Sequence, residues 1–252
     1  MAAILRKISA HAAFMLTAFV VVVFPFAYLA LFGKFAVGGA FVSVARGMAY
    51  SLMLAIAAVL LLYPLSMGYA MQRYQIPPSR IRRFLTRGLH MLKAIPPLVC
   101  AAAVILPVIS LGGRPSFVWA IAAIVLALLP QACSMADGTM KAIPEKYYLA
   151  GVSLGASGSE AMLGVILRMA GRQIRANALL LLSMALDQMA LFQLTLGFAA
   201  GLSPVDAMPL PSQILSSNHA GDLPTAALCA MILLVLSTLF AGMSRRMAKE
   251  AP

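Results

Sequence analysis

The sequence predicts an all-α integral membrane protein with six transmembrane helices, and three observations support this prediction. Of its 252 residues, 62% are hydrophobic and only 10% are charged, which lies outside the composition of soluble domains. Six apolar segments are each about long enough to cross a bilayer, which takes about 20 residues per helix. The Lys and Arg residues gather in alternate loops, as is typical of loops that stay on the inner side of a membrane.

The six predicted spans cover approximately residues 11–33, 47–71, 92–111, 115–135, 174–200 and 223–243. The first follows a short basic stretch, as the core of a secretory signal does. Its apolar run, residues 12–32, is longer than a signal core, so we expect an uncleaved span. Prolines within these segments, such as Pro64 and Pro130, are expected to kink helices rather than to mark sites.

The basic residues also predict the orientation of the chain. If the N-terminus lies inside, only Lys34, Arg46 and Arg114 of the 19 Lys and Arg residues fall on the outer side. Such an excess of basic residues marks the cytoplasmic side of a membrane protein. Both termini are therefore expected in the cytoplasm.

Composition and motifs exclude several classes of function. The net charge of +12 comes from short basic clusters between apolar runs. The continuous basic face with interleaved aromatic residues that would suggest nucleic-acid binding is absent from the sequence. Cys100, Cys133 and Cys229 lie in apolar segments without metal-ligand spacing, so we read them as small buried side chains. We expect no metal site, no catalytic residues and no nucleic-acid partner.

The chain is expected to form one membrane domain, because no repeat and no soluble domain stands out. Residues 1–46 hold the first helix and a short outer loop, and residues 47–252 hold a core of five transmembrane helices.

The loop between the fourth and fifth spans, residues 136–173, is longer than a simple connection requires. The stretch PEKYYLAGVSLGAS starts with a proline that suits a helix start and places Gly155 near its end. Apolar residues at helical spacing follow in SEAMLGVILRMAGRQI. The pattern predicts a helix, a glycine turn and a second helix lying at the cytoplasmic face without crossing the membrane.

This loop resembles that of the membrane subunits of binding-protein-dependent ABC importers, which carry E-A-A, three residues, Gly, nine residues and I-x-L-P. Leu149, Ala150 and Gly151 occupy the E-A-A places, Gly155 falls at the glycine, and residues 165–168 (VILR) form the closing apolar stretch. Leu149 replaces the family's Glu, and Arg168 replaces its Pro.

Other segments are similar to phosphate-type permeases of that family, in order and spacing from Ser51 to the C-terminus. The positions that match in place are Ser51, Leu52, Pro64, Leu65, Ser66 and residues 94–97 (AIPP). In the fifth span the family has R-A-x-G-E-T, and this chain has Met184, Ala185, Leu186, Asp187, Gln188 and Met189.

The resemblance implies a type I ABC importer permease with a coupling helix in loop 136–173 that docks into an ATPase subunit. The expected coupling residues are Tyr147, Tyr148, Leu149, Ala150, Gly151, Gly155 and Ser157. A second permease, two ABC ATPase subunits and a periplasmic or extracellular solute-binding protein are the implied partners, in the inner (plasma) membrane of a prokaryote. Taken alone, the loop also fits an amphipathic helix lying on membrane lipid, with Tyr147 and Tyr148 as interfacial anchors.

Polar residues in the fifth span predict a translocation path. Asn177, Gln188 and Thr195 fall within about 20° of one another at 100° per residue, and Met184 lies on the same face. Asp187 points about 80° away from them. Polar groups inside a span face water or protein, so Asp187 and Gln188 either hydrogen-bond to passing substrate or join helices to one another.

The sequence contains no phosphate-binding G-x-x-x-x-G-K-[ST] motif. The chain is therefore not expected to be an enzyme; ATP and Mg would bind to partner ATPases, and no cofactor to this chain. The predicted function is the permease subunit of an ATP-driven importer for phosphate or a related oxyanion. The alternatives are an importer of another small solute, a stand-alone secondary transporter or channel, and a membrane scaffold.

Overall fold

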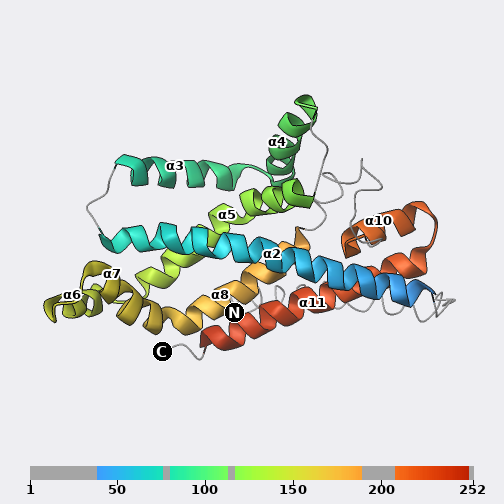
Figure 1. Cartoon of the computed structure of the whole chain (residues 1–252). Helices are drawn as coiled ribbons and strands as arrows, with labels where there is room; N and C mark the ends of the chain where they lie inside the picture. Colours follow the sequence, from blue (N-terminus) through green and yellow to red (C-terminus); the bar gives the residue numbers. More distant parts are fainter. Residues whose placement is uncertain (1–38, 76–79, 113–116, 189–207, 250–252) are drawn as a thin grey trace, which may run out of the picture.

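The structure, a computed structural model, describes residues 39–75, 80–112, 117–188 and 208–249, and their regular secondary structure is helical (Figure 1). The predicted first span lies outside these ranges, as do Lys34, Arg114, Thr195 and the end of the predicted fifth span. The helices are α2 (Gly39–Gln75), α3 (Arg80–Ala94), α4 (Pro97–Ser110), α5 (Phe117–Lys141), α6 (Glu145–Ser153), α7 (Gly158–Ala161), the π-helix η1 (Met162–Ile166), α8 (Leu167–Asp187), α10 (Leu210–His219) and α11 (Leu223–Lys249).

Three of these helices, α2, α5 and α11, are long and apolar enough to cross a membrane. A fourth span results if the bent pair formed by α3 and α4 is counted as one. The prediction of an all-α membrane protein is confirmed in the described residues, and the total of six spans stays a prediction.

The predicted third span, residues 92–111, is not one straight helix. Helix α3 ends at Ala94, α4 begins at Pro97, and the two helices are bent by 105°. Pro96 has an extended backbone (φ −58°, ψ 141°). A residue that precedes a proline is pushed out of the helical region, and proline lacks the N–H that an unbroken helix needs, so the paired prolines end α3 and start α4.

The helix that contains the start of the predicted fifth span begins earlier than expected. The segment that we predicted as a separate helix at the membrane surface runs through α7 and η1 into α8 without a break. It contains no proline, and its arginines are good helix formers, so nothing local ends the helix before the apolar part begins.

Helices α2, α5 and α8 share the main core. Its largest fully buried side chains are Leu54, Leu62, Ile124, Leu181 and Leu186, and its small buried residues are Ala55, Ala58, Ala120, Ala132 and Ala185. Small residues let helix backbones approach closely, which is how helices associate where lipid is as apolar as leucine.

Helix α11 lies antiparallel against α8, and two serines fix their register. Ser183 Oγ donates to the carbonyl oxygen of Ser237 at 3.0 Å, and Ser244 Oγ donates to that of Ala176 at 2.6 Å. From the first pair to the second, the residue number falls by seven on α8 and rises by seven on α11. The two helices therefore keep one register over about two turns.

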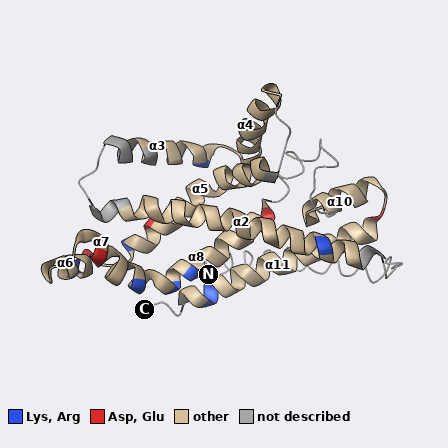
Figure 2. Ribbon diagram, in the orientation of Figure 1, with Lys and Arg blue, Asp and Glu red and all other residues tan. Residues whose placement is uncertain are grey.

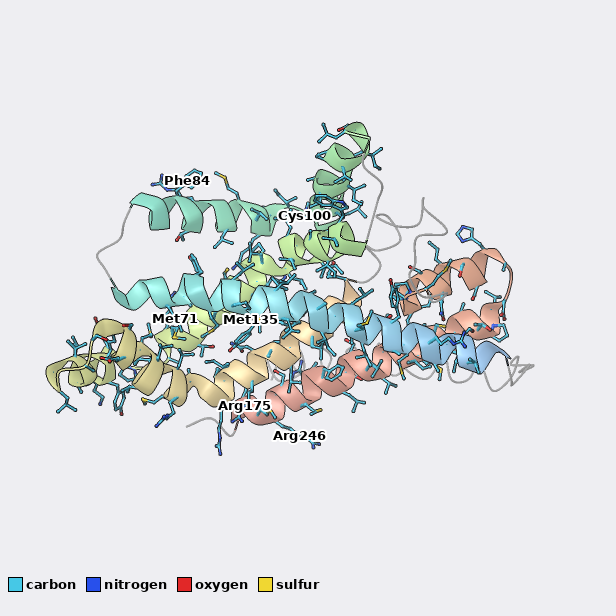
Figure 3. All side chains as sticks on the ribbon, in the orientation of Figure 1. Met71, Phe84, Cys100, Met135, Arg175 and Arg246 are labelled. Atoms are coloured by element: carbon cyan, nitrogen blue, oxygen red, sulfur yellow. The ribbon has the colours of Figure 1, made fainter. Side chains whose placement is uncertain are left out.

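Two polar side chains of helix α3 contact the neighbouring helices. Thr86 Oγ1 hydrogen-bonds Tyr69 Oη of α2 at 3.1 Å, and Lys93 Nζ donates to Ser134 Oγ of α5. Phe84, labelled in Figure 3, is exposed on α3. Exposed apolar side chains of this kind are expected of a helix that faces lipid or another subunit.

Helix α10 closes the end of the bundle opposite α6 and α7 (Figure 1). Ser51 Oγ of α2 accepts a hydrogen bond from the Leu210 N–H at 2.9 Å, and Gln213 Nε2 donates to the Ser43 carbonyl at 3.1 Å. The short helix is thereby tied to the start of α2.

Candidate functional site

The first candidate site is the α6–α7 hairpin, residues 144–161, which projects from one end of the molecule (Figure 1). Helix α5 ends at Lys141, whose Nζ lies 2.6 Å from Asp137 Oδ2 one turn earlier. Pro144, with extended backbone angles, occupies the N-cap of α6. The predicted first helix and glycine turn are confirmed here, whereas the second helix is continuous with α8.

A tight hydrogen-bonded motif ends α6. The Ala156 N–H donates to the Gly151 carbonyl at 3.2 Å, and the Gly155 N–H donates to the Val152 carbonyl at 3.0 Å. This is a Schellman motif, which requires a left-handed residue after the helix. Gly155 supplies it with a φ of +91°, where a side chain would be strained.

A capping box starts α7 two residues later. The Ser157 N–H donates to Glu160 Oε2 at 2.8 Å, and the Glu160 N–H donates back to Ser157 Oγ at 3.3 Å. The bonds from the Ser157 N–H and then from its hydroxyl hold the pKa of Glu160 below its ordinary value. The two motifs fix both ends of the turn with local hydrogen bonds.

The two arms of the hairpin meet through small residues. A Cβ atom at Gly151 would come within 3.1 Å of Ala161 Cβ, and a Cβ atom at Gly158 would lie 2.8 Å from the Tyr148 hydroxyl. Gly151 and Ala161 are buried. Of the predicted coupling residues, Tyr148 and Gly151 therefore face into the hairpin.

The outer face of the hairpin is exposed and largely apolar. It carries Tyr147, Leu149, Val152 and Leu154, the last 89% exposed, and Ala150, Gly155 and Ser157 are also exposed. Lys146 Nζ lies 5.3 Å from the ring centroid of Tyr147. An exposed apolar face on a rigid support is typical of a protein or membrane contact.

The π-helix η1 joins the hairpin to the bundle. Met162 and Ile166 are fully buried against Met67 and Ala70 of α2 and Met140 of α5. Because packed side chains resist deformation, these contacts fix the hairpin firmly to α2 and α5. Single π turns are frequent at functional sites, and the sequence carried no signal that we recognised for this one.

Basic residues gather at the hairpin end of the molecule (Figure 2). In the described residues, Lys146, Arg168, Arg175, Arg245 and Arg246 are exposed there. Arg46, by contrast, lies near the start of α2 at the end that carries α10. That the hairpin faces the cytoplasm stays a prediction, made from these same basic residues.

The second candidate site is the predicted polar stripe on α8, and there Asn177 is engaged with α5. Its Nδ2 donates to Thr139 Oγ1 at 2.7 Å and to the Met135 carbonyl at 3.3 Å, and its Oδ1 accepts from Gln173 Nε2 at 3.3 Å. In this structure the amide joins two helices. Thr139 was not predicted, because the predicted fourth span ended at residue 135, whereas α5 continues to Lys141.

The structure does not bring the other predicted path residues together with Asn177 in the part of the chain that it describes. Met184 is half-buried against the main core, Gln188 follows the last residue of α8, and Thr195 lies outside the described residues. Asp187 lies near the Ser237 side chain of α11, to which Ser183 hydrogen-bonds. Ser183 and Ser237 were not predicted as site residues.

Comparison with known proteins identifies the family. Residues 64–250 match the family described as "Binding-protein-dependent transport system inner membrane component", and the chain belongs to it. It is thus a multi-pass inner membrane protein that serves as the permease subunit of an ABC importer, and ATP hydrolysis in such systems falls to a separate chain. No curated protein matches the chain significantly in sequence.

Solved structures share the fold. The chain superposes on the MetNI methionine ABC transporter in an inward-facing conformation with a TM-score of 0.69 and 16% identity, covering 84% of this chain and 97% of that one. For an amino acid ABC transporter with histidines, the TM-score is 0.61 and the identity 18%, covering 81% of this chain and 93% of that one. For a bacterial alginate ABC transporter in complex with an alginate-pentasaccharide-bound periplasmic protein, the TM-score is 0.65 and the identity 16%, covering 98% of this chain and 96% of that one. These transporters are named for substrates other than phosphate, so the phosphate-type assignment stays a prediction.

Proposed function

We propose that this permease subunit forms half of a translocation path with a second permease and is driven by two ATPase subunits that dock on the α6–α7 hairpin. The observation that carries the proposal is the hairpin itself. Its apolar outer face is exposed, its turn is fixed by a Schellman motif and a capping box, and its second arm runs into α8. A rigid knob continuous with a membrane helix can transmit force from a bound neighbour.

In this mechanism ATP and Mg bind to the ATPases, whose closure and opening move the hairpin. The movement reaches the bundle through Met162 and Ile166, and alternately opens the path inward and outward. A periplasmic or extracellular solute-binding protein delivers the substrate to the outer side.

The geometry favours protein docking over a helix lying on lipid. The lipid interpretation uses both Tyr147 and Tyr148 as interfacial anchors, but the Tyr148 hydroxyl lies close to Gly158 within the hairpin. Of the two tyrosines, only Tyr147 is exposed. With one exposed tyrosine, the hairpin lacks the pair of aromatic anchors on which the lipid interpretation depends.

The substrate that we propose from the sequence resemblance is phosphate or a related oxyanion. Met184 occupies the position of the family's arginine and is half-buried among apolar residues, so a basic group for an oxyanion would come from the second permease. The same observation favours a second candidate, an importer of another small solute that needs no fixed positive charge. Uptake of labelled phosphate by cells that express the complete importer separates the two.

The docking proposal is tested by co-purification. Leu149→Arg places a charge on the exposed apolar face of α6, and Leu215→Arg is a matched control on α10 at the opposite end, where Leu215 is also exposed. We expect Leu149→Arg to lose most of the co-purifying ATPase and Leu215→Arg to retain it, with both variants inserted in the membrane. Full retention of the ATPase by Leu149→Arg would contradict docking through this face.

A further inference from the structure

Helices α8 and α11 change from apolar to basic at the same depth. The bond between Ser244 and the Ala176 carbonyl sets Arg245 beside Ser244 on α11 at the level of Arg175 beside Ala176 on α8. Arg246 follows on α11. Figure 3 labels Arg175 and Arg246 at the same edge of these two neighbouring helices.

The face of α11 that carries Arg246 is apolar and exposed in the two turns that precede this arginine. Leu239 and Met243 precede Arg246 by seven and three residues, which places all three on one side of the helix. Leu239 is 56% exposed and Met243 is 47% exposed, within the candidate span Leu223–Ala248. An exposed apolar stripe that ends in arginine marks the passage from hydrocarbon to headgroups.

The charges of these arginines are not balanced within the described part of the chain. There, no ion pair joins Arg175, Arg245 or Arg246 to a carboxylate, and all three side chains are exposed. Several positive charges held close together on two helices favour an anion as their counter-charge.

We propose that Arg175 and Arg246, with Arg245 beside them, bind the phosphate headgroup of an anionic phospholipid in the cytoplasmic leaflet. The planar guanidinium groups donate paired hydrogen bonds to phosphate oxygens, and basic groups between membrane helices are suited to anionic headgroups. The acyl chains cover Leu239 and Met243. An ATPase is the less suitable occupant, because a protein in the cytoplasm could cover the arginines but not the adjoining apolar stripe, which lies within the candidate span.

The test measures which lipids the purified importer retains. The complex is exchanged in detergent into an equal mixture of phosphatidylglycerol and phosphatidylcholine, and bound lipid is quantified by native mass spectrometry. We expect the wild type to prefer phosphatidylglycerol, and each Arg→Gln change at 175 or 246 to weaken that binding by roughly fivefold. The double variant R175K/R246K keeps the charge but not the paired hydrogen-bond geometry. Its affinity for phosphatidylglycerol should lie between those of the wild type and the Arg→Gln variants.

Arg46→Gln is the control, because it removes one positive charge at the opposite end of the described structure. It should leave phosphatidylglycerol binding unchanged. Equal retention of both lipids by the wild type overturns the proposal, and so does loss of the ATPase from R175Q/R246Q with lipid binding unchanged. Because lipid binding and ATPase co-purification are read separately, failure here does not touch the docking proposal.

Discussion

Gly151 of α6 lies directly against Ala161 of α7, so that a Cβ atom at position 151 would stand 3.1 Å from Ala161 Cβ. That spacing is shorter than ordinary contact between carbon atoms, and Val165 Cγ2 lies 3.7 Å away on the same side. The separation of the two arms of the hairpin therefore depends on the absence of a side chain at one position.

Gly151→Leu should force α6 away from α7. The added side chain has no space between the arms, and overpacking of this kind costs about 1–3 kcal/mol. We expect the ATPase to co-purify weakly and substrate-stimulated hydrolysis to fall. Gly171→Leu in α8 is the control, because a Cβ atom at Gly171 would meet nothing within 4 Å. This variant should retain both the co-purifying ATPase and substrate-stimulated hydrolysis. Equal behaviour of the two variants would contradict this role of Gly151.

Gly155→Val should loosen the turn without preventing membrane insertion. A β-branched residue at a φ of +91° is strained by about 1–2 kcal/mol, whereas Asn adopts left-handed angles more easily. Hydrogen exchange at the Ala156 N–H should therefore accelerate in Gly155→Val and change less in Gly155→Asn. Hydrolysis in the assembled importer should become less dependent on substrate in the same order, and a reversed order would rule out strain as the cause.

Acid should release the capping box of the hairpin. The pKa of Glu160 is lowered by the bonds from Ser157, so this contribution is present above the ordinary pKa of Glu and is lost as pH falls through the lowered value. Exchange protection of the Ser157 N–H, corrected for intrinsic rates, should fall as the pH drops below the ordinary pKa of Glu. Glu160→Gln keeps an oxygen acceptor without the titration, so its protection should not change with pH; parallel loss in both proteins would exclude Glu160 as the titrating group.

The Asn177–Thr139 contact should stabilise the pairing of α8 with α5. Hydrogen bonds between membrane helices contribute about 0.6 kcal/mol on average, so Asn177→Ala and Thr139→Val should each lower thermal stability in detergent modestly. The double variant should be less destabilised than the sum of the two, since both single changes break the same bond. Additive losses, with transport impaired only by Asn177→Ala, would instead assign Asn177 to the translocation path.

The α6–α7 hairpin was predictable from sequence because its determinants are local. Gly155 lies at the turn, as the pattern predicted, and the capping box between Ser157 and Glu160, which was not predicted, also acts over only a few residues. The break between α3 and α4 was not predicted, although Pro96 and Pro97 were visible. Prolines within membrane helices often produce only a kink, and the local sequence does not fix the angle.

By itself, the sequence determined that this is an all-helical membrane protein, through the length and apolarity of its segments, and it located the hairpin. Only the tertiary structure decided where the polar groups of α8 point, Asn177 toward α5 and Asp187 toward α11. The physical reason is that helical periodicity fixes the angles between side chains on one helix but not the rotation of that helix in the bundle. That rotation is set by packing against residues distant in sequence, such as Thr139 and Ser237. The sequence of one helix does not specify which distant residues those are.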